Sequence, residues 1–120
     1  MPILSDVVDL SAYPLRDPAL LERCRAAFDR DGLLTLKGFL RPEAVIDLVK
    51  EAQQERKNAF FTASTHNVYL TPTDPSLPTD HIFNRQVSSS KGCITTDQVP
   101  AGSGLHSLYN SHVFRGFIAQ

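Results

Sequence analysis

Two amphipathic segments, each opened by a proline, limit the folds available to the first half of this chain. In the first segment, Asp17 is suited to accept from the free amide groups at a helix start, and Pro18 occupies a position where no N–H is needed. Apolar residues then recur at helical spacing: Leu21, Cys24 and Phe28. Gly32 accepts the left-handed backbone that ends many helices. We therefore predict a helix over residues 18–31.

A second helix is indicated from Pro42, with Glu43 beside the positive end of its dipole and an end near Asn58. Its predicted buried stripe has the same spacing: Val45, Leu48, Val49 and Ala52. Between the two helices, residues 33–37 form a short apolar run bounded by Gly38, which favours a strand. The predicted order is helix, strand, helix.

The second half of the chain is poor in charge and rich in Ser, Thr, Asn, Pro and Gly, which is typical of loops and short strands. Extended pieces are expected at residues 59–62, 67–71, 82–83 and 93–95. Three prolines forbid regular structure between them: Pro72, Pro75 and Pro78. The overall class is therefore α+β.

A last helix is expected to begin around residues 110–111, because apolar residues recur at helical spacing after that point. It reaches Gln120 without a glycine, a proline or a cationic last turn. We therefore expect the sequence to be the N-terminal piece of a longer protein, with residues 1–120 as a single incomplete domain. The alternative is a natural C-terminus that frays.

Composition excludes several classes of partner. The chain holds 12 Lys and Arg against 13 Asp and Glu, whereas binding to nucleic acid or to an anionic membrane needs a clear cationic excess. No stretch approaches the roughly 20 apolar residues of a membrane span. Cys24 and Cys93 are too few for a disulfide scaffold. These features indicate a soluble protein of the reducing cytoplasm.

Motifs of catalysis are missing from the sequence. Its histidines form none of the pairs that aim two ligands at one metal, such as His-x-Asp or His-x-x-x-His: His66, His81, His106 and His112. Each is more simply a solvated or hydrogen-bonded loop residue. Cys93 lies near Lys91 but has no histidine to activate it. We therefore assign no catalytic residue and no metal ligand.

Four residues are candidates for contact with a substrate or cosubstrate. Tyr69 and Thr71 alternate on one side of the strand expected at residues 67–71, so both side chains can face one cleft. Arg85 and Lys91 are among the few charges of the second half, and an isolated cation in a polar loop region is a candidate partner for a carboxylate. The alternative is that all four are ordinary surface groups.

Residues 28–45, FDRDGLLTLKGFLRPEAV, resemble the opening of the non-haem Fe(II)/2-oxoglutarate-dependent oxygenases, particularly the phytanoyl-CoA hydroxylase-like branch. There, too, a helix ends in Asp-Gly, a strand rises to Gly-Phe-Leu and a proline-initiated helix follows. Residues 60–71 and 89–93 are similar to a small bacterial subgroup of the same superfamily. The resemblance implies that the helix–strand–helix unit packs outside the large sheet of a double-stranded β-helix, or jelly-roll, barrel.

The resemblance also implies an activity: oxidation of a small organic substrate with Fe(II), 2-oxoglutarate and oxygen. Members of the family hold Fe(II) with a His-x-Asp/Glu pair and a distal His, and these motifs are absent from the 120 residues. We therefore expect an inactive N-terminal portion that binds neither iron nor 2-oxoglutarate alone, with the catalytic half supplied from elsewhere. The alternative is a small non-catalytic α+β binding or interaction module.

Overall fold

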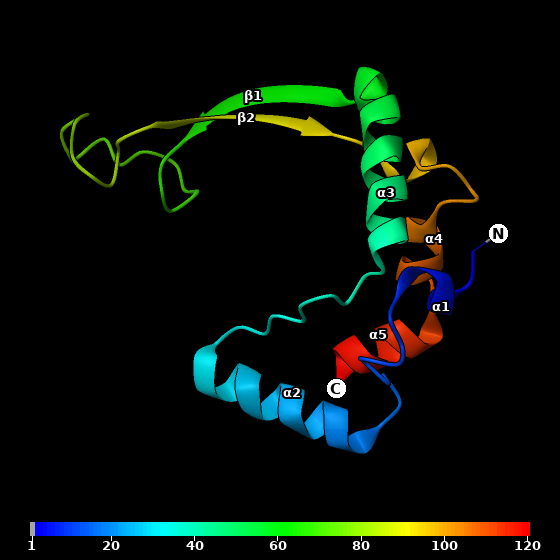
Figure 1. The fold of residues 1–120 in the computed structure, drawn as a ribbon. Helices are drawn as coiled ribbons and strands as arrows, with labels where there is room; N and C mark the ends of the chain where they lie inside the picture. The colour runs from blue at the N-terminus through cyan, green and yellow to red at the C-terminus, as the bar shows by residue number, and fades with distance from the viewer. Residues whose placement is uncertain (1) are drawn as a thin grey trace. The chain divides into compact units, whose positions relative to one another are not determined.

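The computed structural model describes residues 2–120 and contains five α-helices, two short 3-10 helices and one two-stranded antiparallel sheet (Figure 1). The expected α+β class is confirmed. The chain divides into two compact units. Unit 1 holds the residues up to Lys57 together with Thr96–Gln120, and unit 2 holds Asn58–Thr95. Each unit is described by itself below.

The first long helix of unit 1, α2 (Pro18–Asp31), forms as its end signals predict. The carboxylate of Asp17 accepts a hydrogen bond from the amide of Ala19 at 2.9 Å, which satisfies one of the free donors of the first turn. Gly32 ends the helix at a φ of 71°, in the left-handed region that glycine adopts without a steric penalty. Short-range chemistry is sufficient to set both ends.

The second long helix, α3 (Pro42–Glu55), also begins where predicted and continues into the 3-10 turn η1 (Arg56–Asn58). The predicted buried stripe is wrong: Val45 is exposed, and Val49 is 51% exposed. Helix α3 packs instead on the short helices α1 (Leu4–Val7) and α4 (Gly104–Tyr109). That contact uses a neighbouring face, with Ala44 buried and the carboxylate of Glu51 accepting from the Ser103 hydroxyl at 2.7 Å.

The strand predicted at residues 33–37 is wrong. Residues 33–36 are neither helix nor strand and Lys37 lies in a turn, because a strand needs a neighbour and residues 2–120 supply none at this place. Pairing begins only after Gly38, where Leu40 forms an isolated antiparallel bridge with Val8. The amide of Arg41 also donates to the carbonyl of Val7 at 2.8 Å. The connection between α2 and α3 is therefore fixed to the N-terminal segment.

Unit 1 holds two small clusters of buried apolar residues. The first contains Leu15, Leu20, Cys24 and Phe117, and the second contains Val7, Val8 and Ala44. Phe39 lies next to both clusters, and its ring centroid is 5.7 Å from that of Tyr13 and 5.9 Å from that of Phe114. The core is thus assembled around the N-terminal segment and the last helix.

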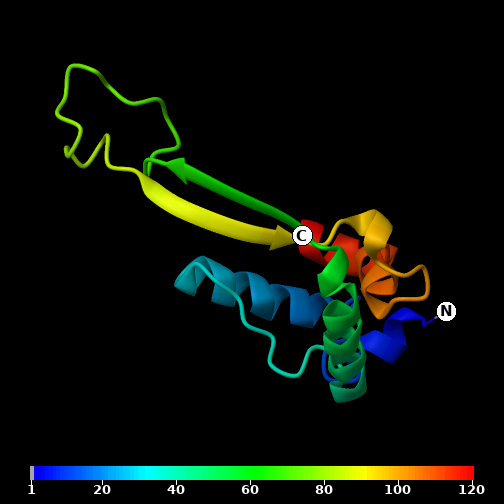
Figure 2. The same cartoon turned by 90° about the horizontal axis from the view of Figure 1, so that it is seen from above.

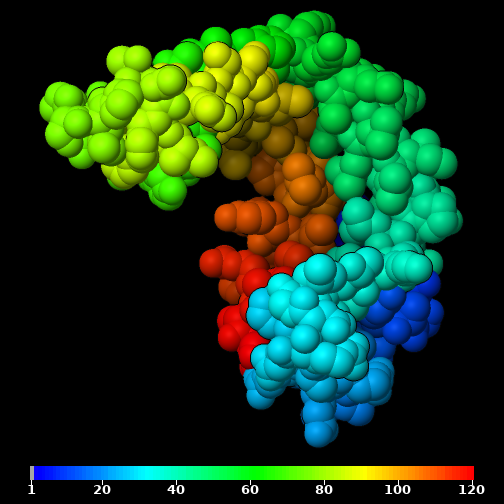
Figure 3. All heavy atoms as spheres, turned by 90° about the vertical axis from the view of Figure 1, so that its left-hand side faces the viewer, coloured from blue at the N-terminus to red at the C-terminus, as the bar shows by residue number. Residues whose placement is uncertain are grey.

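That last helix, α5 (His112–Ala119), confirms the expected start near residue 110. It follows Ser111, whose hydroxyl accepts from the amide of Phe114 at 3.2 Å. The space-filling view shows the atoms of α5, in red, beside those of α2, and Arg25 donates to the Gln120 carbonyl at 2.7 Å (Figure 3). Helices α1 and α4 were not predicted, because helices of four and six residues are too short to show an apolar periodicity.

Unit 2 is a β-hairpin, formed by β1 (Phe60–His66) and β2 (Val87–Cys93) in a register that runs from Phe60 opposite Cys93 to His66 opposite Val87. The two strands run side by side and carry a long loop at one end (Figure 2). The extended piece expected at residues 59–62 lies within β1 except for Ala59, which precedes the strand. Of the piece expected at residues 93–95, only Cys93 belongs to a strand, as the last residue of β2. The strands expected at 67–71 and 82–83 are wrong, because both segments form turns.

Candidate functional site

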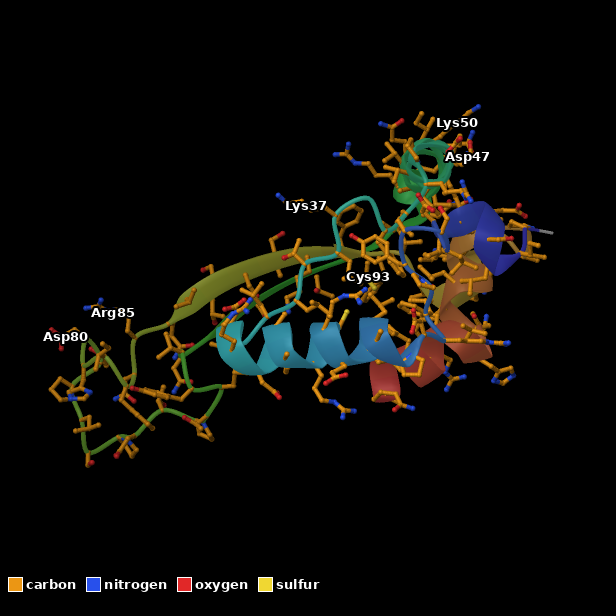
Figure 4. All side chains as sticks on the ribbon, turned by 60° about the horizontal axis from the view of Figure 1, so that its bottom comes forward. Lys37, Asp47, Lys50, Asp80, Arg85 and Cys93 are labelled. Atoms are coloured by element: carbon orange, nitrogen blue, oxygen red, sulfur yellow. The ribbon has the colours of Figure 1, made fainter. Side chains whose placement is uncertain are left out.

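Three of the four predicted contact residues lie in the loop that joins the two strands of unit 2. We call residues 67–86 the connecting loop. It contains Tyr69, Thr71 and Arg85, whereas Lys91 lies within β2 opposite Thr62. Figure 4 shows Arg85 with Asp80 at the loop end of the hairpin and Cys93 at the opposite end. The loop is therefore the place in unit 2 where polar and aromatic side chains are brought together.

One anchor of the loop is Asn67, which is only 1% exposed. Its side-chain nitrogen donates to the Thr71 hydroxyl and to the Phe83 carbonyl, each at 3.0 Å. Its side-chain oxygen accepts from the Thr71 amide at 2.9 Å. One buried amide thus joins the start of the loop to its end, in a region where prolines prevent backbone pairing.

The second anchor is Asn84, which is 6% exposed. Its side-chain oxygen accepts from the Asp74 amide at 2.7 Å, and its nitrogen donates to the Asp74 carbonyl at 2.8 Å. The same nitrogen also lies 3.2 Å from the carbonyls of Leu77 and Pro78. A central asparagine therefore replaces the hydrogen bonds that a strand or helix would provide.

The two anchors hold an aromatic pair. The rings of Tyr69 and Phe83 are stacked with their centroids 5.4 Å apart, and Tyr69 stays 57% exposed. The prediction that Tyr69 and Thr71 project from one side of a strand is wrong, because the segment is a turn and the Thr71 hydroxyl is engaged by Asn67. Tyr69 is left as the exposed aromatic contact surface, and Thr71 contributes to holding the loop.

Lys91 is separated from this group. Four residues lie between the end of the loop and Lys91 along β2, so the two are separated by about 16 Å of strand. Its side chain shares a strand face with that of Cys93, because the two alternate in the same phase. The structure therefore brings Tyr69 and Thr71 together with Phe83, two residues before Arg85, and it leaves Lys91 on the body of the hairpin.

Three titratable groups in or next to the loop, His66, Asp74 and His81, make hydrogen bonds with backbone groups. The Phe83 amide donates to Nδ1 of His81 at 3.1 Å, so this nitrogen must be unprotonated while the contact is made. Nδ1 of His66 lies 2.9 Å from the Asn67 carbonyl, which only accepts, so there Nδ1 carries the proton. Hydrogen bonds from Ser76, hydroxyl first and then amide, lower the pKa of Asp74, and the nearby His81 adds to this effect.

A hollow lies within unit 1. It has a volume of about 780 Å³ and is lined mainly by apolar side chains from α2, α5 and the connection between α2 and α3. Those side chains include Leu21, Cys24, Phe28, Leu34, Phe39 and Ile118. Polar groups are confined to Arg25, Asp29 and Gln120. This surface suits apolar packing and offers few groups that would orient a polar substrate.

Sequence reasoning missed Asn67, Phe83 and Asn84. A signal was available for the two asparagines, since asparagine beside proline-rich turns commonly bonds to nearby backbone. Nothing in the spacing of the sequence identifies the pairing of Phe83 with Tyr69, which depends on how the loop closes.

Comparison with known protein families, curated proteins and solved structures gives no match to this chain. Within residues 2–120, no group of three or more His, Cys, Asp or Glu side chains is arranged to hold a metal ion. None of the helices over the same residues is both long enough and apolar enough to cross a membrane. The geometry of the loop and of the exposed apolar faces therefore carries the functional interpretation.

Proposed function

We propose that this chain is the N-terminal portion of a non-haem Fe(II)/2-oxoglutarate-dependent oxygenase of the phytanoyl-CoA hydroxylase-like kind, acting on a small organic substrate. The order of α2, a connection through Gly38 and Phe39 that is neither helix nor strand, and the proline-initiated α3 supports the proposal. The sequence resemblance depends on this order of helices and on a strand between them, and residues 33–37 form no strand here. In that family, the jelly-roll barrel holds the Fe(II) ion, which reacts with 2-oxoglutarate and oxygen.

The observation that carries the proposal is the exposure of large apolar side chains on both long helices and on the connection between them. Phe28 on α2 is 54% exposed, and further exposed residues are Leu33, Leu34, Val45, Ile46 and Val49. Apolar side chains that form a contiguous exposed patch mark interaction surfaces in soluble proteins. A barrel packed against α2 and α3 would remove these groups from water.

The connecting loop supplies candidate substrate contacts in this proposal. Tyr69 offers an exposed ring, and Arg85 offers a guanidinium group that can bind a carboxylate through two parallel hydrogen bonds. Lys91 is a further candidate from the hairpin body, and Thr71 acts by holding the loop. We place the protein in the cytoplasm, which is supported by two free cysteines, Cys24 and Cys93.

The test is iron binding by two proteins: the 120-residue chain and the complete product of the gene that encodes it. We expect the gene to encode a His-x-Asp/Glu pair and a later His beyond these residues, and we expect the complete product to bind one Fe(II) and to consume 2-oxoglutarate. The 120-residue chain should bind no Fe(II) at micromolar concentration. Stoichiometric binding by the chain itself, or a gene without these ligands, would overturn the proposal.

The same exposed surfaces support one alternative, a small non-catalytic interaction module that functions as these 120 residues. The gene sequence and the iron titration distinguish the oxygenase portion from the interaction module. A complete product that lacks the metal ligands and unfolds cooperatively as a monomer would favour the module.

A further inference from the structure

We propose that unit 1 contains a binding site for a small organic carboxylate with a short apolar or aromatic body, in a hollow along one face of α5. The hollow has a volume of about 340 Å³ and is lined by residues 15–16 before α2, by Leu21 of α2 and by one face of α5. We call it the α5 hollow. It lies outside the connecting loop, and the proposal goes beyond the proposed function and does not rest on it.

Two basic residues line the α5 hollow and come from two different places in the chain. Arg16 directly precedes the cap residue of α2, and His112 is the first residue of α5. Both residues are exposed, and among residues 2–120 neither side chain has a partner in a hydrogen bond or an ion pair. A guanidinium group can bind a carboxylate through two parallel hydrogen bonds, and an imidazole donates at least one, whether neutral or protonated. The unused donors of these two residues therefore favour an anionic ligand.

The acidic residues that are near these donors in the chain do not line the hollow. Asp17 follows Arg16, but its carboxylate accepts from the Ala19 amide at 2.9 Å. Glu22 follows a lining residue of α2 and is not part of the lining itself. In the part of the chain that the structure describes, no aspartate or glutamate lines the hollow. A bound anion would therefore meet hydrogen-bond donors without a facing carboxylate.

The other walls of the hollow are mainly apolar and belong to the first buried cluster of unit 1. Leu15 is 4% exposed and Phe117 is 8% exposed, and both line the hollow together with Leu21 and Val113. Ligand sites of about 300 to 1,000 Å³ combine such apolar walls with a few polar groups. The walls favour a carboxylate with an apolar body over a bare inorganic anion, because only the former has apolar surface to bury.

Gly116 is the residue of the lining that points to an occupant. It lies inside α5, where glycine is the least favourable residue apart from proline. Its φ is not positive, and apart from the local backbone no atom lies within 4 Å of the place where a Cβ would stand. Neither backbone conformation nor packing therefore requires a glycine here. Because Gly116 lines the hollow, a larger side chain would take up the space that a ligand needs.

The test is an NMR titration of the 120-residue chain with sodium benzoate, and with sodium phosphate at equal ionic strength for comparison. We expect benzoate to shift the amide signals of Leu15, Leu21 and Phe117, with a Kd of about 1 to 5 mM. Phosphate should bind at least about 5-fold more weakly, because it has no apolar body to bury.

Charge variants separate binding in the hollow from a general attraction of anions. Arg16→Gln should weaken benzoate binding at least about 5-fold, because it removes the guanidinium donors. Arg23→Gln removes the same charge from an exposed residue of α2 that does not line the hollow, and it should leave the Kd unchanged. His112→Gln should weaken binding by about 2- to 5-fold.

Gly116→Leu tests the space itself. It should fill the hollow and weaken benzoate binding at least about 10-fold. The urea midpoint of unfolding should not fall, because leucine is a better helix former than glycine. Ala119→Leu enlarges an exposed residue of the same helix that does not line the hollow, and it should leave the Kd unchanged. Arg16 is exposed, so Arg16→Gln decides the question even where Gly116→Leu fails to fold.

Three results would contradict the proposal. Absence of benzoate binding by the wild-type chain at about 20 mM would overturn it, and so would binding that either Arg16→Gln or a folded Gly116→Leu leaves unchanged. Phosphate binding as tight as that of benzoate would overturn the assignment of a carboxylate with an apolar body. None of these results depends on iron, so a failure here is distinct from a failure of the oxygenase proposal.

Discussion

At the scale of single residues, polar side chains rather than apolar ones determine the structure of unit 2. Its hairpin buries no large apolar side chain, and its buried residues are Asn67 and Asn84. An unpaired buried amide costs about 1 to 3 kcal/mol, and both of these side chains are satisfied by the loop backbone. The sequence contains the residue types of such a loop but no pattern that tells which backbone groups each asparagine binds.

Asp74 gives a prediction at this scale. Its carboxylate accepts from the hydroxyl and amide of Ser76, and these contacts lower the pKa of Asp74. Because the charged form is favoured in the fold, the turn is stabilised above the ordinary pKa of an aspartate and loses this support as pH falls through the lowered value. Ser76→Ala should raise the pKa of Asp74 toward its ordinary value, as measured by NMR titration of the carboxyl carbon.

The control is Ser90→Ala, which removes a hydroxyl from the body of the hairpin at an exposed position. It should leave the titration of Asp74 unchanged. An unchanged pKa in Ser76→Ala as well would show that the hydroxyl contact does not hold the carboxylate in solution.

At the scale of elements, the helices with strong end signals are predictable, whereas the strands are predicted only in part. Asp17 and Gly32 fix α2 because a cap and a left-handed residue act over one turn of chain. Residues 33–37 have strand-like composition but remain unpaired, since pairing requires a neighbour that local sequence does not specify. For the same reason, the segment 67–71 forms a turn and not a strand. The Asn67 side chain accepts from the Thr71 amide, which a strand would use for pairing.

Gly32 gives a prediction for α2. Its φ is 71° and no atom lies within 4 Å of the place where a Cβ would stand, so Gly32→Ala meets backbone strain without a clash. We expect a loss of about 1 kcal/mol in the free energy of unfolding, measured by urea denaturation of the chain.

The matched control is Gly102→Ala, which also meets open space but at a position without a positive φ. It should change the free energy of unfolding by less than about 0.5 kcal/mol. Equal effects of the two substitutions would exclude backbone strain as the cause.

At the scale of the whole molecule, the number of exposed apolar side chains is the main finding. The buried apolar residues of unit 1 form small clusters, while Phe28, Val49 and their neighbours face water. The sequence predicts both helices but places the α3 stripe in the core, because periodicity shows that an apolar face exists and not what covers it. If the proposed function is right, an oxygenase barrel would supply that cover.

The most direct measurement compares Val49→Gln in the 120-residue chain and in the complete gene product. In the chain, Val49 is 51% exposed, so we expect the substitution to change the free energy of unfolding by less than about 0.5 kcal/mol. In the complete product, where the barrel would bury this side chain, we expect a loss of about 1.5 kcal/mol or more. Lys50→Gln on the same helix serves as the control, with a small effect in both proteins (Figure 4). Equally small effects of Val49→Gln in the two proteins would contradict the account.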